Sequence, residues 1–103
     1  MGNRSITQGV HDEIPVWLQN LMWFLRETIA EPERAPMQAF QLACSENGVQ
    51  IVQLSQESIP YSKRVEVDTK GESVVGKIYV LEDNGNAVMM LGREFEAPKH
   101  RIE

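Results

Sequence analysis

The sequence has 103 residues, of which 42% are hydrophobic and 24% are charged, and its formal net charge is −5. This composition is typical of a folded globular protein and argues against a disordered chain. An acidic surface repels phosphate, so nucleic acid is disfavoured as a partner. The single cysteine excludes an internal disulfide and a cysteine-rich zinc site.

The length fits one domain over residues 1–103, and we expect frayed ends at residues 1–4 and 96–103. No apolar run approaches the roughly 20 residues of a membrane span, and the N-terminus lacks the apolar core of a signal peptide. The sequence therefore predicts a cytoplasmic protein with no membrane partner. No motif predicts a cofactor or a metal.

The first elements are a short strand at residues 5–10 and a helix that begins at Pro15. Proline suits a first helical turn because its φ angle is already helical and its missing N–H is not needed there. We expect the helix to end by Glu31, because the residue before a proline is driven out of the helical region. Its apolar positions recur at spacings of three and four and predict a core stripe, flanked by Trp17 and Phe24. The stripe consists of Leu18, Leu21, Met22, Leu25 and Ile29.

From residue 37 onward the hydrophobic period changes from helical to two, which is typical of strands. We predict strands at residues 37–44, 49–55, 64–68, 74–81 and 87–91, the fourth of them central because it is the most apolar. Asn47-Gly48 and Asn84-Gly85 predict tight hairpins, because both residue types tolerate positive φ angles. The resulting order is β-α-β-β-β-β-β. It predicts an α+β fold in which one amphipathic helix packs on an antiparallel sheet of about five or six strands.

One side chain on the helix does not fit the core stripe. Trp23 lies about 140° around the helix from Leu18, at about 100° per residue, on a polar side shared with Val16, Asn20 and Glu27. Exposed tryptophan is the residue most favoured as an anchor of protein interfaces. These four residues form our candidate partner-binding site. The alternative is that a curled sheet or a terminal segment covers the indole ring.

Two catalytic patterns are weak. Residues 71–77 match the start of a phosphate-binding P-loop, but a strand rather than a helix follows them. Cys44 could act as a nucleophile with His11 or His100 as its base. However, it lies on the same apolar side of its strand as Phe40, which predicts a buried, inert thiol.

The carboxylates and histidines give no stronger signal. Glu82 and Asp83 are strand neighbours and point to opposite faces, while Glu94 and Glu96 share a face near a polar end of the chain. Perturbed carboxylates need burial or a close partner, so we expect all four to be solvated. His11 has no second histidine at a metal-site spacing, and we expect it to be solvated as well.

The chain resembles a family of small Gram-positive bacterial proteins that is catalogued only as a domain of unknown function, first described from staphylococci. The resemblance covers roughly nine-tenths of the chain in the same order. It is carried by Gly9-Val10, Ile14-Pro15, Leu18-Gln19, Trp23, Leu25, Gln38, Phe40, Leu42, Pro60-Tyr61, Lys63, Gly76-Lys77-Ile78-Tyr79-Val80, Asp83 and Met90-Leu91. The sequence departs from the family pattern in the connector at residues 30–36, where two prolines replace a more helical, acidic stretch.

The resemblance implies an α+β fold, no established reaction, and genes found on phages and plasmids as well as chromosomes. We therefore expect a non-catalytic protein-interaction module, with a nuclease effector of host defence or a second copy of the chain as its partner. Such a module would be an inhibitor of the anti-CRISPR or anti-restriction type. The alternatives are a nucleic-acid-binding protein that stacks bases on Phe40 or Tyr79 of the sheet, and an enzyme with Cys44 as nucleophile.

Overall fold

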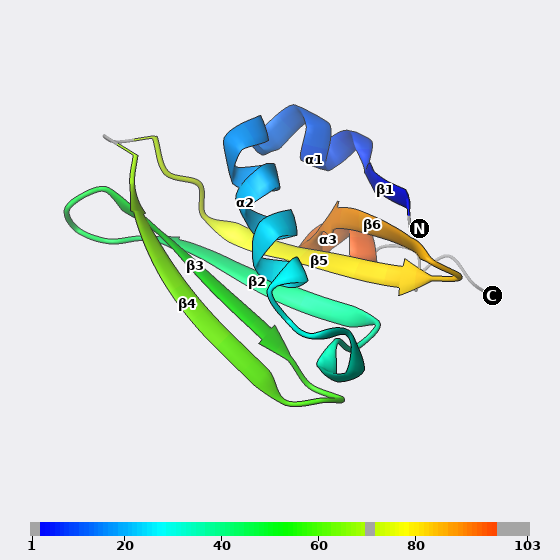
Figure 1. The fold of residues 1–103 in the computed structure, drawn as a ribbon. Helices are drawn as coiled ribbons and strands as arrows, with labels where there is room; N and C mark the ends of the chain where they lie inside the picture. The colour runs from blue at the N-terminus through cyan, green and yellow to red at the C-terminus, as the bar shows by residue number, and fades with distance from the viewer. Residues whose placement is uncertain (1–2, 70–71, 97–103) are drawn as a thin grey trace.

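Alternating strands and tight turns build one twisted sheet, and two helices lie across one of its faces (Figure 1). The computed structural model describes residues 3–69 and 72–96 of the chain. Within these residues six strands pair in the order β1-β6-β5-β2-β3-β4. They are β1 (Asn3–Ile6), β2 (Met37–Cys44), β3 (Val49–Gln56), β4 (Tyr61–Asp68), β5 (Gly76–Asp83) and β6 (Asn86–Leu91).

The α+β prediction is confirmed, and so is the central position of the most apolar strand. Strands β2 to β6 pair antiparallel with their neighbours, whereas β1 joins the edge of β6 in parallel. A parallel pair needs a long crossover, and here the whole chain between residues 6 and 86 separates the two strands. The remaining elements are α1 (Gln8–Glu13), α2 (Val16–Glu27), α3 (Gly92–Glu96) and the 3₁₀ turn η1 (Glu31–Glu33).

Turn chemistry explains the hairpins. Asn84 and Gly85 both have positive φ angles, of 54° and 83°, as a tight two-residue hairpin turn requires. In the β2–β3 turn only Gly48 is left-handed, with φ at 79°, and its N–H donates to the carbonyl oxygen of Ser45 over 3.0 Å. The hairpin at Asn47-Gly48 therefore forms as expected, but through one left-handed residue rather than two.

The N-terminal prediction is wrong in its boundary. The first strand ends at Ile6, and residues 8–10 begin α1 instead of continuing the strand. Thr7 is the N-cap of this helix, and its hydroxyl accepts from the N–H of Val10 over 3.3 Å. Of the N-terminal residues expected to fray, residues 3 and 4 belong to β1, and residues 1 and 2 lie outside the described residues. At the C-terminus we expected residues 96–103 to fray. Glu96 is the last residue of α3, and residues 97–103 lie outside the described residues.

The core lies between the sheet and the layer of α1 and α2. Helix α2 begins after Pro15, as predicted, and ends at Glu27, four residues before Glu31. Four of the five stripe residues are buried, and Leu21 is half-buried. They meet the inward side chains of the strands, which include Phe40, Leu42, Val52, Leu54, Ile78, Val80 and Met89. The opposite face of the sheet, here called the far face, carries Tyr79, whose ring packs 4.5 Å from that of Phe95 in α3.

A carboxylate ties the two ends of the described chain together. Glu94 accepts hydrogen bonds from the Thr7 hydroxyl (2.6 Å) and from the backbone N–H groups of Leu91 (2.8 Å) and Gly9 (3.2 Å). A side chain at Gly9 would put its Cβ 2.5 Å from a Glu94 oxygen, so only glycine allows this approach. Burial acts against the charged form of Glu94, but the three hydrogen bonds and Arg93 together lower its pKa.

Replacing this carboxylate tests its contribution to stability. We expect Glu94→Gln to lower the free energy of unfolding by about 1 kcal/mol at neutral pH, because the amide cannot accept all three hydrogen bonds. A folded-state pKa below the unfolded value stabilises the protein above about pH 4.3, and that stability is lost as the pH falls through the folded pKa. Urea denaturation at neutral and at acidic pH should therefore show a difference between native and variant chains that shrinks in acid. A difference that does not depend on pH would contradict the role of the charge.

Candidate binding surface on helix α2

Buried polar side chains set the rotation of α2 about its axis. Arg26 is only 5% exposed and Gln19 is 8% exposed, so the inward side of the helix includes both. Arg26 donates from Nε to the Gln38 side-chain oxygen over 2.6 Å and from a terminal nitrogen to Glu82. Gln19 donates to the carbonyl oxygen of Ile14 over 2.7 Å. A buried polar group costs free energy unless it is hydrogen-bonded, so the bonds of Arg26 to Gln38 and Glu82 fix which side of α2 faces the sheet.

The network continues into the sheet and the connector. Gln38, which is fully buried, donates to the Ala35 carbonyl (2.6 Å) and to the Gln56 side-chain oxygen (2.8 Å). Gln56 donates in turn to the carbonyl oxygen of Glu33 over 3.0 Å. Burial lowers the pKa of the Arg26 guanidinium, and the Glu82 carboxylate beside it acts against this shift. The network therefore joins α2, η1, β2, β3 and β5.

With this rotation Trp23 is buried, which overturns the expectation that its indole ring is exposed. The residue is 5% exposed and belongs to the same core cluster as Leu18. The Arg4 guanidinium of β1 lies 5.2 Å from the centroid of the Trp23 ring and also pairs with Glu27. The N-terminal strand therefore covers this side of α2, which is the alternative the sequence left open. Trp23 cannot anchor a partner from this position.

The other three residues of the predicted site are exposed. Val16 is 67% exposed, and Asn20 and Glu27 are exposed as well. The exposed aromatic residues beside them are Trp17 (36%) and Phe24 (63%), which the sequence analysis placed next to the core. The buried residues Gln19 and Arg26 extend the inward arc of the helix from Leu18 toward Trp23 and leave the opposite flank outside.

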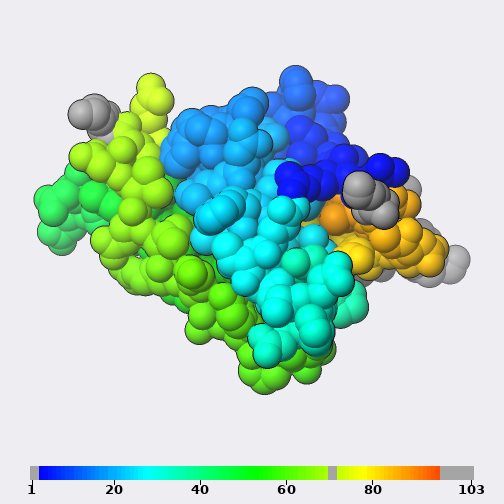
Figure 2. Space-filling model, viewed as in Figure 1, coloured from blue at the N-terminus to red at the C-terminus, as the bar shows by residue number. Residues whose placement is uncertain are grey.

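The outward residues of α2 form one continuous surface. Trp17 and Phe24 lie two turns apart on nearly the same side, with half-buried Leu21 between them. Leu21 and Trp23 are about 200° apart around the helix at about 100° per residue. Because Trp23 faces β1, this flank leans toward β3 and β4. We call Val16, Trp17, Asn20, Leu21 and Phe24 the α2 surface. Figure 2 shows this face, with α2 between β4 on one side and β1 on the other.

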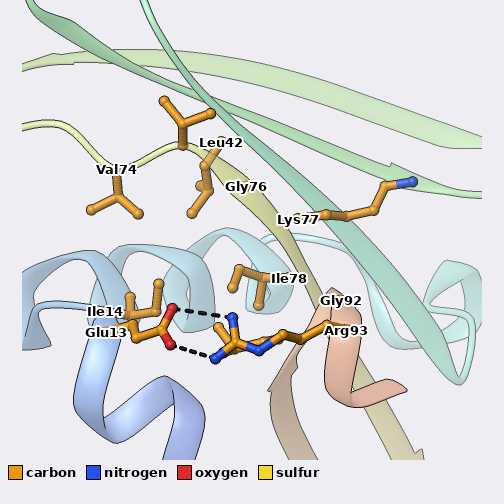
Figure 3. Close-up of a pocket in the computed structure, with 11 residues that line it drawn as sticks. Glu13, Ile14, Leu42, Val74, Gly76, Lys77, Ile78, Gly92 and Arg93 are labelled. Carbon is orange, nitrogen blue, oxygen red and sulfur yellow. Dashed lines mark hydrogen bonds and ion pairs between the residues drawn. The ribbon is translucent and has the colours of Figure 1, made fainter. Parts of the chain in front are cut away.

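A hollow of about 360 Å³ lies at the end of the sheet near α1 and α3 (Figure 3). Its walls combine apolar side chains, Ile14, Leu42 and Ile78 among them, with charged ones. Arg93 donates to both carboxylate oxygens of Glu13 at the rim, and this hydrogen bonding lowers the pKa of Glu13. The opposite charges of Glu13 and Arg93 therefore pair with each other at the rim. The hollow can accept a small apolar group, but it offers no acid–base pair.

The other predicted residues lie on separate elements as far as the structure describes them. Cys44 is exposed and not buried, because it lies at the last position of β2, and its thiol donates to the Ser45 carbonyl over 3.3 Å. His11 is exposed on α1 and contacts Gln8 and Asp12. His100 lies outside the described residues. Among the described residues no group of three or more histidine, cysteine, aspartate or glutamate side chains could hold a metal ion.

The remaining candidates have structural roles. Glu82 pairs with Arg26, and Glu94 binds Thr7 from the α3 helix, so neither is simply solvated as expected. Gly76 and Lys77 begin β5, and no helix follows them, so the P-loop match has no structural counterpart. Phe40 is fully buried on the helix side of the sheet, and Tyr79 is 9% exposed beneath Phe95. Within the described residues no helix is long and apolar enough to span a membrane.

The fold defined here is an α+β sheet with a helical layer on one face, and the comparisons agree with it. The chain belongs to the family described as staphylococcal protein of unknown function (DUF960), whose family model matches residues 3–94. A solved structure of a protein of unknown function from Enterococcus faecalis is similar, with a TM-score of 0.72 and 18% sequence identity over 90% of both chains. At this identity the likeness shows the fold alone. No curated protein matches the chain.

Truncating each tryptophan of α2 tests the rotation of the helix. We expect Trp23→Ala to lower the free energy of unfolding by about 3–5 kcal/mol, because it leaves a large cavity in the core. Trp17→Ala should cost about 1 kcal/mol or less, because its ring is partly in solvent. Chemical denaturation of the two variants measures both values. Equal losses would contradict the assignment of Trp23 to the core.

Proposed function

We propose that the chain is a non-catalytic module that binds a protein partner through the α2 surface. The observation that supports this is the exposure of Phe24 (63%) and Trp17 (36%), which lie two turns apart on one flank of a helix. Large apolar side chains that gather on one exposed flank are characteristic of interaction sites. Aromatic residues near the centre of such a surface supply most of the binding energy when a partner covers them.

The charge of the chain favours a basic partner. The net charge is −5, and complementary charge raises association rates and selects partners. Nucleases that act on foreign DNA hold their substrate in positively charged grooves, which an acidic protein can occupy in place of nucleic acid. We therefore propose a nuclease effector of host defence as the partner, and inhibition of that nuclease as the role of the protein.

A panel of purified Cas9-type and restriction nucleases tests this function. The native chain should bind a member of the panel and inhibit its cleavage of DNA. Phe24→Ala and Trp17→Ala should each weaken that binding by about tenfold or more, as for residues at the centre of an interface. Biolayer interferometry measures the affinity, and a cleavage assay measures the inhibition.

The matched control is Val75→Ala, because Val75 is 71% exposed and lies outside α2. It should bind and inhibit like the native chain, and circular dichroism should show that all three variants remain folded. If the native chain inhibits no nuclease in the panel, the proposed role is wrong. If it inhibits one and the aromatic variants bind as tightly as Val75→Ala, the α2 surface is not the contact.

A further inference from the structure

Strand β4 forms one border of the sheet along its whole length. All eight of its residues, Tyr61–Asp68, pair with β3 on one side, and no other described strand pairs with it. In Figure 1 it forms the outer border of the sheet, on the side away from β1. An outer strand directs alternate N–H and C=O groups away from the sheet, and these can pair with a further strand. Strands of this length usually have their border covered or interrupted.

The charges of β4 reverse sign at its centre. Arg64 and Glu66 flank Val65, and both project from the far face because Val65 pairs with the core residue Val52 on the helix side. The two charged side chains are 53% and 55% exposed, and the Arg64 guanidinium lies 2.8 Å from the Glu66 carboxylate. Val65 itself is only partly buried and packs against the core. A strand placed beside β4 therefore meets a positive charge, an apolar centre and a negative charge in turn.

We propose that β4 pairs antiparallel with β4 of a second copy, with the two Val65 residues opposite each other. In this register Arg64 lies opposite Glu66 of the second copy, and Glu66 lies opposite its Arg64. Opposite charges directly across an antiparallel pair stabilise it, and like charges destabilise it. Sliding one strand by two residues in either direction places Arg64 opposite Arg64 or Glu66 opposite Glu66. The sequence of β4 thus complements itself in this register.

The helix side of the joined strands fits the same register. Lys63 lies opposite Val67 of the second copy, and its methylene groups can cover that side chain while the ammonium group reaches water. A two-fold axis perpendicular to the sheet relates the two copies, so the two six-stranded sheets form one continuous sheet. Both α2 surfaces then lie on the same side of it. This pairing goes beyond the proposed function and does not depend on it.

Charge reversal distinguishes this register from other modes of association. Sedimentation analysis of the native chain should show a species of twice the 11.7 kDa monomer mass. Arg64→Glu and Glu66→Arg should each weaken self-association by about tenfold or more, because each places like charges opposite each other twice. The double variant should associate like the native chain. An equimolar mixture of the two single variants should form a heterodimer, because every facing pair then has opposite signs.

The control is Asp83→Arg, which changes the net charge by the same amount as Glu66→Arg at an exposed position on another strand. It should dimerise like the native chain, and circular dichroism should confirm that every variant is folded. A native chain that stays monomeric up to about 1 mM overturns the proposal. The proposal is also wrong if both single variants dimerise like the native chain, or if the single variants do not associate when they are mixed. Each of these results leaves the nuclease-binding test of the α2 surface unaffected.

Discussion

The buried hydrogen bonds of Arg26 determine how the helical layer sits on the sheet. A guanidinium that is 5% exposed needs partners for its donors, and Gln38 and Glu82 supply them from adjacent strands. Apolar contacts alone allow a helix to roll over a sheet by a fraction of a turn with little change in buried area. A charged group with fixed partners removes that freedom. The identity of the outward residues of α2 follows from this one side chain.

This constraint separates the two tryptophans of α2. Trp23 turns toward β1, where the Arg4 side chain covers its ring, and Trp17 turns toward solvent on the other flank. The sequence analysis reached the opposite assignment because it centred the buried side on the apolar stripe alone and did not include Gln19 and Arg26 in it. Both are buried. Polar residues that are satisfied inside a core look the same in sequence as polar residues in water, and only their partners distinguish them.

Much of the fold was predictable, because turns and hydrophobic periods are local signals. The hairpins at Gly48 and Gly85 and the helix start after Pro15 are all present. The helix α1, the exposure of Cys44 and the position of Glu94 were not predicted. The position of Glu94 depends on a contact between distant segments, because it binds Thr7 near the other end of the described chain. Cys44 lies at the end of its strand, where alternation with buried residues no longer means that the side chain is buried. Of the predicted site, Val16, Asn20 and Glu27 are on the surface, and the anchor residue Trp23 is not.

The parallel pairing of β1 with β6 has a consequence for synthesis of the chain. Residues 3–6 leave the ribosome well before residues 86–89, with which they pair. The border of the sheet at β1 therefore closes only after residues 86–89 have been translated, and contacts of such long sequence separation form slowly. Until then the indole ring of Trp23 lacks the cover that Arg4 provides. The nascent chain therefore exposes an aromatic surface that the folded protein covers. Chaperones bind exposed surfaces of this kind.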